Sequence, residues 1–398
     1  MDRSPNTSIL ETHNLVTHFH TYEGVVKALN GVSLNVDHGL TFGLVGESGC
    51  GKSVFARSVM RIIGPPGRVE GGKVLFYRVS TDRSGEAVAP AAGIDLLAQS
   101  ETFMETLRGD GISMIFQEPN AALNPIMRIG DQVAESFLFH RKREMCAAVL
   151  ADLGSSVCRT WGPLKRWLHW VYAQAAANPD AAFLKLLTRT PVLKRWRRPL
   201  LREAERRAVE IIGKLGIPNP EKISGRYPHN LSGGMKQRIV IAMALACGPS
   251  LLIADEATSN LDVTIQAQIL ELLRQLKETE ISSVLLITHD LGVVAETCDR
   301  VGVMYAGNLC EVADVADLFG YPRHPYTHAL LQAVPRMSQT GDLQSIPGGV
   351  PNLVDPPPGC RFHPRCPRAG EICEAELPPL EEISGGHFAA CHFPLEDE

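Results

Sequence analysis

The sequence lacks an apolar run long enough to cross a bilayer as a helix, which takes about 18 residues or more. The longest candidate, residues 239–254, is interrupted by Gly248-Pro249-Ser250. The first residues, MDRSPNTSILETH, also lack the basic and then apolar pattern of a secretion signal. We therefore expect no membrane-spanning segment and a location inside the cell.

The sequence also lacks internal repeats, and only 6% of its 398 residues are aromatic. Its hydrophobic share of 44% and charged share of 21% are typical of a globular protein, with one large domain and an appendage or with two domains. The net charge of −5 hides one basic segment. Residues 143–207 contain 13 Lys and Arg against 5 Asp and Glu, together with all 4 tryptophans.

Hydrophobic patterning predicts strands that alternate with helices after a β-rich beginning. Residues 9–45 indicate short strands and turns, and residues 79–93 a polar loop inserted in a β region. Further strands are expected at 112–117, 250–254 and 284–288, and helices at 52–63, 130–216 and 263–277. From residue 324 onward proline, glycine and cysteine dominate and periodicity is lost. This order predicts an α/β core with a parallel sheet.

Residues 46–53, GESGCGKS, match the phosphate-loop pattern G-x-x-x-x-G-K-[ST] between a predicted strand and a predicted helix. The glycines would let the backbone wrap the β-phosphate, Lys52 would reach the β- and γ-phosphates, and Ser53 would offer its hydroxyl to Mg²⁺. We therefore predict a nucleotide site formed by Gly46, Glu47, Ser48, Gly49, Cys50, Gly51, Lys52 and Ser53.

A cysteine lies inside this loop. Cys50 is expected at the N-terminus of a helix, where the pKa of a thiol tends to fall. We therefore predict that thiol alkylation blocks ATP hydrolysis and that bound ATP protects the enzyme.

Residues 251–256, LLIADE, form an apolar strand that ends in two adjacent carboxylates. Following a phosphate loop, Asp255 would orient Mg²⁺ through water, and Glu256 would polarise the attacking water as a general base.

A second phosphate-binding pattern lies between these motifs. Residues 231–235, LSGGM, place a hydroxyl and two glycines before a predicted helix, whose N-terminus favours anions. The sequence has no second lysine-containing loop for it to serve. The local sequence therefore does not show which phosphate loop binds the nucleotide that LSGGM would contact.

The order of the phosphate loop, Gln117, LSGGM, Asp255-Glu256 and His289 resembles that of the ATP-binding cassette (ABC) ATPases. The resemblance implies a RecA-like parallel-sheet core with an antiparallel β region, a helical subdomain and an irregular Cys-rich C-terminal tail. It also implies ATP hydrolysis, with Lys52, Glu256 and His289 as catalytic residues.

The resemblance assigns further roles. Gln117 is similar to the glutamine that senses Mg²⁺ and touches the membrane partner, Asp262 to the aspartate of the D-loop, and His289 to the histidine that contacts the γ-phosphate. Ser232, Gly233 and Gly234 would complete the ATP site of a neighbouring subunit. An aromatic residue that stacks on adenine is expected before the phosphate loop. We choose Phe19, and Tyr22 stays open because the spacing is ambiguous.

The sequence between the motifs resembles one subfamily of the ABC ATPases. FQEP at 116–119, LNP at 123–125, RYPH at 226–229, HPYT at 324–327 and the tail 359–367 resemble the oligopeptide, dipeptide and nickel importers. This implies a peripheral ATPase subunit at the cytoplasmic face of the membrane that energises import of di- or oligopeptides. Its partners would be a second identical or homologous ATPase subunit and two integral permease subunits, with an extracytoplasmic binding protein acting indirectly.

Two other functions stay open. One is import of nickel or another small solute, and the other is a non-transport ABC ATPase that acts on nucleic acid. We expect no nucleic-acid partner, because such proteins carry two cassettes or long coiled coils and would leave HPYT and the cysteine tail without a role.

Four cysteines lie near the C-terminus: Cys360, Cys366, Cys373 and Cys391. Four thiolates can hold zinc or an iron–sulfur cluster, and without CxxC pairs the spacing does not choose between them. The resemblance to the importers favours a [4Fe–4S] cluster. His363, His387 and His392 are alternative ligands.

We divide the chain into an ABC ATPase domain at 1–320 and a C-terminal segment at 321–398. The first contains a helical subdomain at about 126–235 with an extra basic, Trp-rich insert at about 145–199. Within the insert, the basic and Trp-containing segments KRW at 165–167 and KRWRR at 194–198 have three possible interpretations. These are a solvated basic face, a contact with an anionic membrane or permease, and a nucleic-acid contact.

Overall fold

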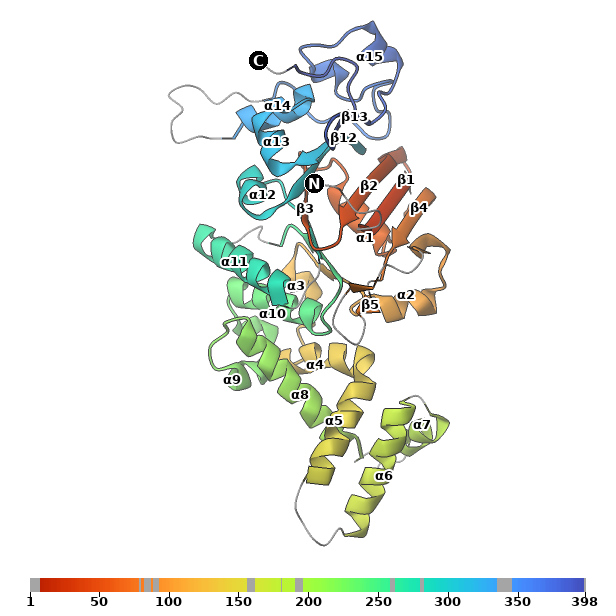
Figure 1. Cartoon of the computed structure of the whole chain (residues 1–398), viewed down its shortest axis with the longest axis vertical. Coiled ribbons are helices and arrows are strands. Elements are labelled where there is room, and N and C mark those ends of the chain that lie inside the picture. The colour runs from red at the N-terminus through yellow and green to blue at the C-terminus, as the bar shows by residue number, and fades with distance from the viewer. Residues whose placement is uncertain are drawn as a thin grey trace. The chain divides into compact units, whose positions relative to one another are not determined.

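The computed structural model describes residues 8–78, 80–81, 87–88, 93–155, 162–179, 181–189, 196–257, 262–279, 283–334 and 346–396. The chain forms two compact units (Figure 1). The first comprises Met1–Gln117, Ser250–Ser259 and Leu273–Glu398, and the second comprises Glu118–Pro249 and Asn260–Leu272. No helix among the described residues is both long and apolar enough to span a bilayer.

An eight-stranded sheet runs through the first unit in the order β13-β14-β12-β11-β3-β10-β9-β8. The strands β11, β3, β10, β9 and β8 are parallel, and β12, β14 and β13 continue the sheet in antiparallel pairing. Their bounds are β3 (Thr41–Val45), β8 (Ile112–Ile115), β9 (Leu251–Asp255), β10 (Ser283–Ile287), β11 (Arg300–Tyr305), β12 (Asn308–Asp314), β13 (Glu381–Ser384) and β14 (His387–Ala389). The predicted α/β core with a parallel sheet is confirmed.

The sequences of the central strands explain their position. TFGLV of β3, LLIAD of β9 and SVLLI of β10 are buried at every residue. Such continuous apolar runs are typical of parallel strands that are covered on both faces. The sheet thus delivers the residues that follow β3 and β9 to one edge, where the carboxyl ends of parallel strands meet.

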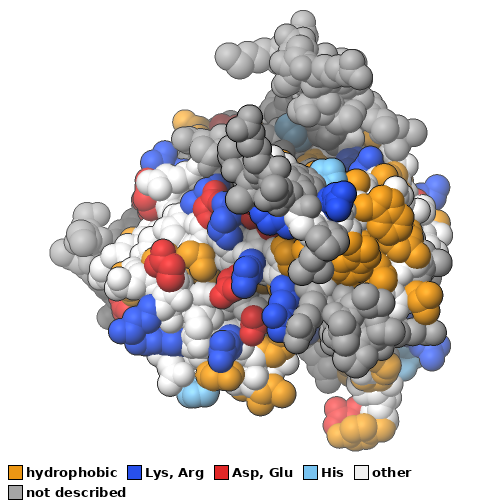
Figure 2. Space-filling model, turned by 90° about the horizontal axis from the view of Figure 1, so that it is seen from below, with side chains coloured by type: hydrophobic (Ala, Val, Ile, Leu, Met, Phe, Trp, Pro, Cys, Tyr) orange, Lys and Arg blue, Asp and Glu red, His pale blue; other side chains and the backbone are white. Residues whose placement is uncertain are grey.

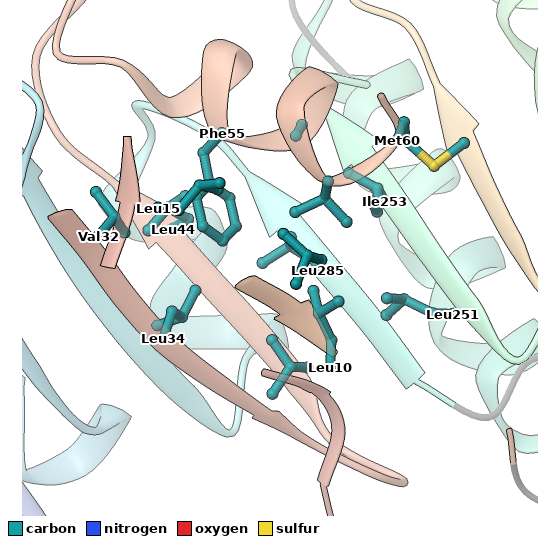
Figure 3. Packing of buried hydrophobic residues seen from close by; sticks show 14 of the residues in the cluster. Leu10, Leu15, Val32, Leu34, Leu44, Phe55, Met60, Leu251, Ile253 and Leu285 are labelled. Carbon is teal, nitrogen blue, oxygen red and sulfur yellow. The ribbon is translucent and has the colours of Figure 1, made fainter. Parts of the chain in front are cut away.

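A four-stranded antiparallel sheet with the order β2-β1-β4-β7 packs into the same core. Its strands are β1 (Ser8–Thr21), β2 (Gly24–Asp37), β4 (Gly67–Phe76) and β7 (Ile94–Asp95). Figure 3 shows Leu10, Leu15 and Leu34 of this sheet facing Phe55 of helix α1 (Lys52–Val59) and Leu285 of β10. A hairpin of β5 (Ser80–Thr81) and β6 (Ala87–Val88) lies in the expected polar loop, most of which falls outside the described residues.

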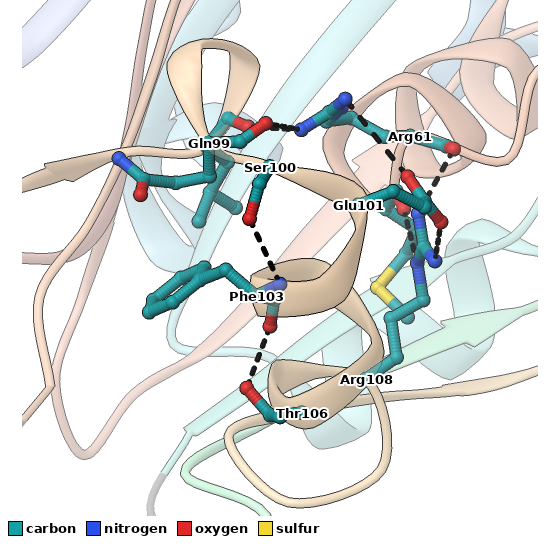
Figure 4. A network of polar contacts seen from close by, with 9 residues as sticks. Arg61, Gln99, Ser100, Glu101, Phe103, Thr106 and Arg108 are labelled. Carbon is teal, nitrogen blue, oxygen red and sulfur yellow. Dashed lines mark hydrogen bonds and ion pairs between the residues drawn. The ribbon is translucent and has the colours of Figure 1, made fainter.

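A polar network fixes the end of helix α1 (Figure 4). The Arg61 guanidinium donates to the carbonyls of Leu96 and Gln99, at 3.0 and 2.6 Å, in and after the 3-10 turn η1 (Leu96–Ala98). Arg108, which follows α2 (Glu101–Leu107), donates to the carbonyls of Met60 and Arg61 and pairs with Glu101. The sequence did not predict α2, whose N-cap is Ser100.

The C-terminal region is more regular than the sequence predicts. It contains α14 (Pro325–Gln332), the 3-10 turn η4 (His363–Arg365), α15 (Glu371–Ala375) and the β13–β14 hairpin. Because β14 pairs with β12, the tail extends the central sheet. Helices α12 (Leu291–Thr297) and α13 (Val315–Gly320) precede this region. Residues 321–398 therefore share a compact unit with the strands.

A buried carboxylate fixes the start of the tail. Glu311 of β12 is 0% exposed and accepts hydrogen bonds from the backbone N–H groups of Arg323 and His324. His387 of β14 lies 2.6 Å from the same carboxylate. His324 in turn caps α14 through Nδ1, which accepts the Tyr326 N–H. The histidine of the HPYT motif thus has a structural role.

The second unit is helical. Its elements are α3 (Pro119–Ala122), α4 (Ile129–His140), α5 (Lys142–Ser155), α6 (Pro163–Ala177), α7 (Ala182–Arg189), α8 (Arg197–Lys214), α9 (Pro220–Ser224), η3 (Pro228–Asn230), α10 (Gly233–Leu245) and the first part of α11 (Val263–Thr279). Helix α4 packs against α8, and α5 packs against α6. The extra insert therefore consists of α5, α6, α7 and the beginning of α8.

The insert has a small core of its own. Met145, Val171 and Tyr172 are fully buried, and the Tyr172 hydroxyl donates to the Trp196 carbonyl and accepts the Leu200 N–H. Trp196 is 2% exposed, so this tryptophan does not serve a surface contact as the membrane reading assumed. Trp161, Lys194 and Arg195 lie outside the described residues.

One exposed tryptophan remains in the described part of the insert. Trp170 is 53% exposed and packs against Phe183 of α7, and Leu186 is 63% exposed. Seen from below, hydrophobic side chains gather on one part of the visible face, and Lys, Arg, Asp and Glu mix on another (Figure 2). Trp170 and Leu186 thus give the described part of the insert exposed apolar side chains in addition to its basic residues.

Candidate nucleotide site

The phosphate loop joins β3 to α1, and its glycines are required by space as well as by conformation. Gly46 has φ +149°, and a Cβ there would lie 2.1 Å from the Met304 carbonyl oxygen. Gly51 has φ +108°, and its Cβ would lie 2.6 Å from the Ala28 carbonyl oxygen. L-residues avoid such φ values, so only glycine fits both positions. Backbone atoms of the first unit therefore restrict the conformation of the phosphate loop.

Lys52 begins helix α1 and turns its ammonium group back into the loop. Its Nζ donates to the carbonyls of Gly46 and Glu47, at 2.8 and 3.1 Å, and the residue is 5% exposed. This holds a positive charge against two carbonyl groups of the loop at a helix N-terminus, an arrangement that suits a phosphate.

The expected reactivity of Cys50 is not supported. The residue is 0% exposed, and burial raises the pKa of its thiol although Lys52 lies nearby and lowers it. Desolvation outweighs the helix N-terminus here, because the charged thiolate loses its water. The prediction that this thiol has a low pKa is wrong, and with it the reason to expect ready alkylation.

Ser53 and Asp255 meet where β9 ends. The Ser53 hydroxyl donates to Asp255 Oδ1 at 2.8 Å, and Asp255 is fully buried. Its Oδ2 has no hydrogen-bond partner among the described residues, and burial raises the pKa of the carboxyl group. A hydroxyl beside an unpaired buried carboxylate oxygen fits Mg²⁺, which takes hard oxygen ligands and keeps several waters.

Glu256 is held between two of the residues predicted for the site. Gln117 Nε2 donates to its Oε2 at 2.6 Å, and His289 Nδ1 lies 3.4 Å from its Oε1. Glu256 itself has φ +46°, a left-handed conformation that costs about 1 kcal/mol or more for such a residue. The structure thus brings together Ser53, Asp255, Glu256, Gln117 and His289 in the first unit.

The two candidates for the adenine-stacking aromatic differ in their surroundings. Phe19 lies on β1 opposite Gly67, and a Cβ on Gly67 would approach its ring to 2.6 Å. Tyr22 lies in the turn between β1 and β2 and is 97% exposed. The Phe19 ring is thus packed against its own sheet, and the geometry favours Tyr22, the alternative that the sequence left open.

The signature residues lie in the second unit, at the start of α10. Ser232 is the N-cap, and its side chain accepts the Met235 N–H at 3.4 Å. Gly233 is exposed, and apart from its chain neighbours and its own helix backbone no described atom lies within 4 Å of where its Cβ would stand. Asp262 similarly caps α11, since its Oδ1 accepts the Ile265 N–H at 3.0 Å. Residues 258–261, which precede Asp262, lie outside the described residues.

Two contacts on the phosphate loop were not predicted from the sequence. The Glu47 N–H donates to the Tyr326 hydroxyl at 3.0 Å, and the Glu47 carboxylate pairs with the Arg365 guanidinium. Both partners belong to the C-terminal region. Tyr326 and Arg365 lie in the HPYT and cysteine segments, but no sequence pattern places either residue at the loop.

The four cysteines of the tail line one small cavity, together with Phe362 and Phe393. The Cys360 N–H donates to the Cys373 carbonyl at 2.8 Å, and burial raises the pKa of Cys391 to about 11. Within the described ranges no three His, Cys, Asp or Glu side chains are close enough to hold one metal ion. His363 and His392 also line the cavity, whereas His387 is paired with Glu311.

A phosphate loop, a magnesium-type carboxylate with an adjacent glutamate, and a serine–glycine helix start in a separate helical unit characterise an ABC ATPase. The comparisons with known proteins agree. Residues 29–259 match the family model described as ABC transporter, and residues 310–373 match that of the oligopeptide/dipeptide transporter C-terminal region. The chain belongs to the ABC transporter ATP-binding proteins and carries the C-terminal region of the oligopeptide/dipeptide transporters.

Relatives match over nearly the whole chain. A probable peptide ABC transporter ATP-binding protein of Sinorhizobium fredii is 41% identical, and the match covers 98% of this chain and 97% of that protein. The dipeptide transport ATP-binding protein DppD of Bacillus subtilis is 39% identical, with 96% and 94% covered. The oligopeptide transport ATP-binding protein OppD of the same organism is also 39% identical, with 96% and 88% covered.

A solved structure supports the fold. An ATP-binding cassette determined as a dimer in a post-hydrolysis state, with ADP and phosphate bound, aligns with a TM-score of 0.52 at 20% identity. The alignment covers 77% of this chain and 98% of that one. The expected cassette fold is therefore confirmed.

Proposed function

We propose that this chain is the ATP-hydrolysing subunit of an importer for dipeptides or oligopeptides and works at the cytoplasmic face of the membrane. The observation that carries the proposal is the joint presence of the nucleotide site and the oligopeptide/dipeptide transporter C-terminal region in one chain. Relatives of about the same length are described as peptide, dipeptide and oligopeptide transport proteins. Substrate selectivity would lie in the permease and in an extracytoplasmic binding protein.

The residues of the first unit have distinct tasks in hydrolysis. The loop backbone and Lys52 would bind the β- and γ-phosphates, and Ser53 with Asp255 would hold Mg²⁺, which would neutralise charge on the phosphates. Glu256 accepts a proton from the attacking water. Gln117 and His289 each contact one oxygen of this carboxylate and would position the general base.

The signature residues would act on the nucleotide of another subunit. The N-terminus of α10 presents Ser232 and Gly233 to solvent, and it carries no acidic residue in its first turn. A helix start of this kind attracts phosphate. In the proposed dimer it completes the site built on Lys52 of a second cassette, identical or homologous, and the closing of the dimer drives two permease subunits.

Uptake measurements test the peptide assignment. Cells that lack this gene are complemented with the wild-type chain or with Glu256→Gln, and uptake of labelled dipeptides, labelled oligopeptides and radioactive nickel is compared. The proposal expects peptide uptake to return only with the wild type, while nickel uptake stays the same in all cells. Nickel uptake that follows the wild-type gene, with unchanged peptide uptake, would replace the peptide assignment with the nickel one.

Copurification tests the partners. A tagged wild-type chain extracted with its membrane should bring a second cassette and two permeases, identified by mass spectrometry of the intact complex. ATPase activity that is stimulated by nucleic acid and indifferent to the permeases would contradict the transport function.

For the tail we propose a [4Fe–4S] cluster held by Cys360, Cys366, Cys373 and Cys391. The proposal is supported by the position of the four cysteines, which line one cavity, and by the ability of four thiolates to hold such a cluster. The cluster would supply a structural cross-link of the tail. Iron and sulfide analysis of anaerobically purified protein tests it, with Cys373→Ser expected to lose both, and stoichiometric zinc without iron contradicting it.

A further inference from the structure

Among the contacts of the C-terminal region with the phosphate loop is an arginine, Arg365, whose hydrogen-bonding capacity is fully used. Arg365 Nη1 and Nη2 donate to the two carboxylate oxygens of Glu47, at 2.8 and 3.1 Å. Nη1 also donates to the Tyr305 hydroxyl, Nη2 to the Ile346 carbonyl and Nε to the Pro347 carbonyl. These contacts occupy all five N–H donors that a guanidinium has.

The surroundings of this pair favour a rigid contact. The Arg365 side chain is 6% exposed and the Glu47 side chain 26%. The guanidinium carbon lies 5.7 Å from the centre of the Tyr305 ring, and Tyr305 packs against Tyr326 and Phe362. Burial disfavours the charged guanidinium, but the hydrogen bonds to Glu47 and Tyr305 raise the pKa of Arg365. Two-pronged arginine–carboxylate pairs in such settings are stronger and more specific than surface pairs.

Glu47 is a member of the phosphate loop, so whatever holds Glu47 also holds the loop. Its N–H is fixed by Tyr326, its carboxylate by Arg365, and its carbonyl accepts from Lys52 Nζ at 3.1 Å. The same C-terminal region also contacts strand β2, where the Lys27 N–H donates to the Leu353 carbonyl at 2.9 Å.

We propose that Arg365 is a positioning residue for ATP binding, which holds the phosphate loop through Glu47, so that the C-terminal region sets the ATP affinity of the chain. The contact is formed within the first unit, without a partner subunit. Arg365 need not touch ATP to have this effect. A loop that is already ordered loses less conformational entropy when ATP binds, so its affinity for ATP is higher. The inference rests on the proposed assignment of residues 46–53 as the phosphate loop.

The test measures the dissociation constant of Mg-ATP for the purified full chain by calorimetry. Arg365→Ala should raise this constant about fivefold to tenfold, since it removes the charge-assisted pair on Glu47. Arg365→Lys, which keeps the charge but loses the fork, should have an intermediate effect. Arg368→Ala is the matched control, an exposed arginine three residues along the same segment, and should change the constant less than about twofold.

Two further readouts separate positioning from a general loss of structure. Glu47→Gln leaves the contacts of Arg365 with Tyr305, Ile346 and Pro347 in place, so it weakens ATP binding without disturbing the tail. The double variant Arg365→Ala/Glu47→Gln should bind no more weakly than the weaker single variant, because both remove the same interaction. In the assembled transporter, KM for ATP should rise while kcat stays within about twofold.

The proposal is overturned if folded Arg365→Ala and Glu47→Gln both bind ATP within about twofold of the wild type, or if Arg368→Ala weakens binding equally. Reduced kcat with unchanged KM would also overturn it, since that pattern indicates a smaller active fraction. Lys52→Ala distinguishes failure of the phosphate-loop assignment from failure of the role of Arg365. If it binds ATP normally, the phosphate-loop assignment itself fails; if it loses binding and Arg365→Ala does not, only the role of Arg365 fails.

Discussion

The phosphate loop and the signature segment both place glycines at the start of a helix, yet their surroundings are opposite. Gly46 is enclosed, and a Cβ there would lie 2.1 Å from a backbone oxygen of its own unit. Gly233 is exposed and has no described atom within 4 Å of the same position. The two segments share a residue type for different reasons.

The difference shows which half of the site the chain builds alone. The phosphate loop is shaped by Met304, Ala28, Tyr326 and Arg365 before any nucleotide arrives. At Gly233 the signature segment meets no comparable described atom, and its helix start is capped by its own Ser232. The fold of the chain does not itself require a glycine at position 233. A glycine there suits a surface whose backbone must come close to a ligand or another subunit.

The largest effect is expected for Gly46→Ala. The methyl group would collide with the Met304 carbonyl, and alanine is strained at φ +149°. We expect the dissociation constant of Mg-ATP to rise by at least about a hundredfold, because the loop must move to fit the side chain. Titration calorimetry measures it.

Gly31→Ala is the control for Gly46→Ala. Gly31 also has a positive φ, of +80°, but no described atom lies within 4 Å of the position of its Cβ. This variant should lose some stability and keep its ATP affinity. Equal loss of ATP binding in both variants would show that the enclosed environment of Gly46 is irrelevant.

Glu256→Gln should separate chemistry from binding within the first unit. The amide cannot accept a proton from water, so we expect the hydrolysis rate to fall about a hundredfold or more. The ATP dissociation constant should stay within about twofold of the wild type, since Glu256 faces Gln117 and His289 rather than the loop. Phosphate release by the assembled complex and ATP binding by the chain are the two measurements. Hydrolysis near the wild-type rate would exclude Glu256 as the general base.

Tyr22→Ala should weaken ATP binding about tenfold if the exposed ring stacks on adenine, whereas Tyr22→Phe should retain most of the affinity. Comparison with a nucleotide that has a different base sharpens the test, because the loss should be specific to the stacked ring. Unchanged ATP affinity in Tyr22→Ala would instead indicate Phe19 as the residue that stacks on adenine.

The smallest effect concerns the packing of the tail. Burial lowers the pKa of His324 to about 4, below its ordinary value of 6.5. Because the unfolded chain binds this proton more readily, stability is present above about pH 6.5 and is lost as the pH falls toward 4. We expect about 1 kcal/mol of unfolding free energy to be lost between about pH 7.5 and 5.5 through this residue.

His324→Asn isolates that contribution. Asparagine can still accept the Tyr326 N–H at the N-cap of α14 but does not titrate. Denaturant unfolding at the two pH values should therefore show a shallower pH dependence in the variant. An identical dependence in both proteins would show that His324 is not responsible.

Much of the fold and the order of the site residues could be predicted from the sequence. The buried strands β3, β9 and β10 are continuous apolar runs, and each ends where the sequence placed a motif. Glycine, lysine and adjacent carboxylates at fixed spacings indicate phosphate chemistry because few other structures need them together. These signals are local, so a single sequence contains them.

The features that the sequence did not reveal depend on contacts between distant segments. Arg365 meets Glu47 across more than three hundred residues of chain, and nothing near either residue indicates the pair. Cys50 has the position of a reactive thiol, but its burial, set by the surrounding core, decides its pKa. Trp196 belongs to a basic run and yet packs against Tyr172. Tertiary packing overrode the local pattern in each case.

The central claim is that this chain binds ATP with its own loop and offers its signature segment to another subunit. Gly233→Ala tests it most directly, because the isolated chain has room for the methyl group. We predict that the ATP dissociation constant of the purified variant stays within about twofold of the wild type, while ATP hydrolysis by the assembled transporter falls at least about tenfold. Loss of ATP binding by the isolated chain, or full hydrolysis by the assembled transporter, would contradict the account.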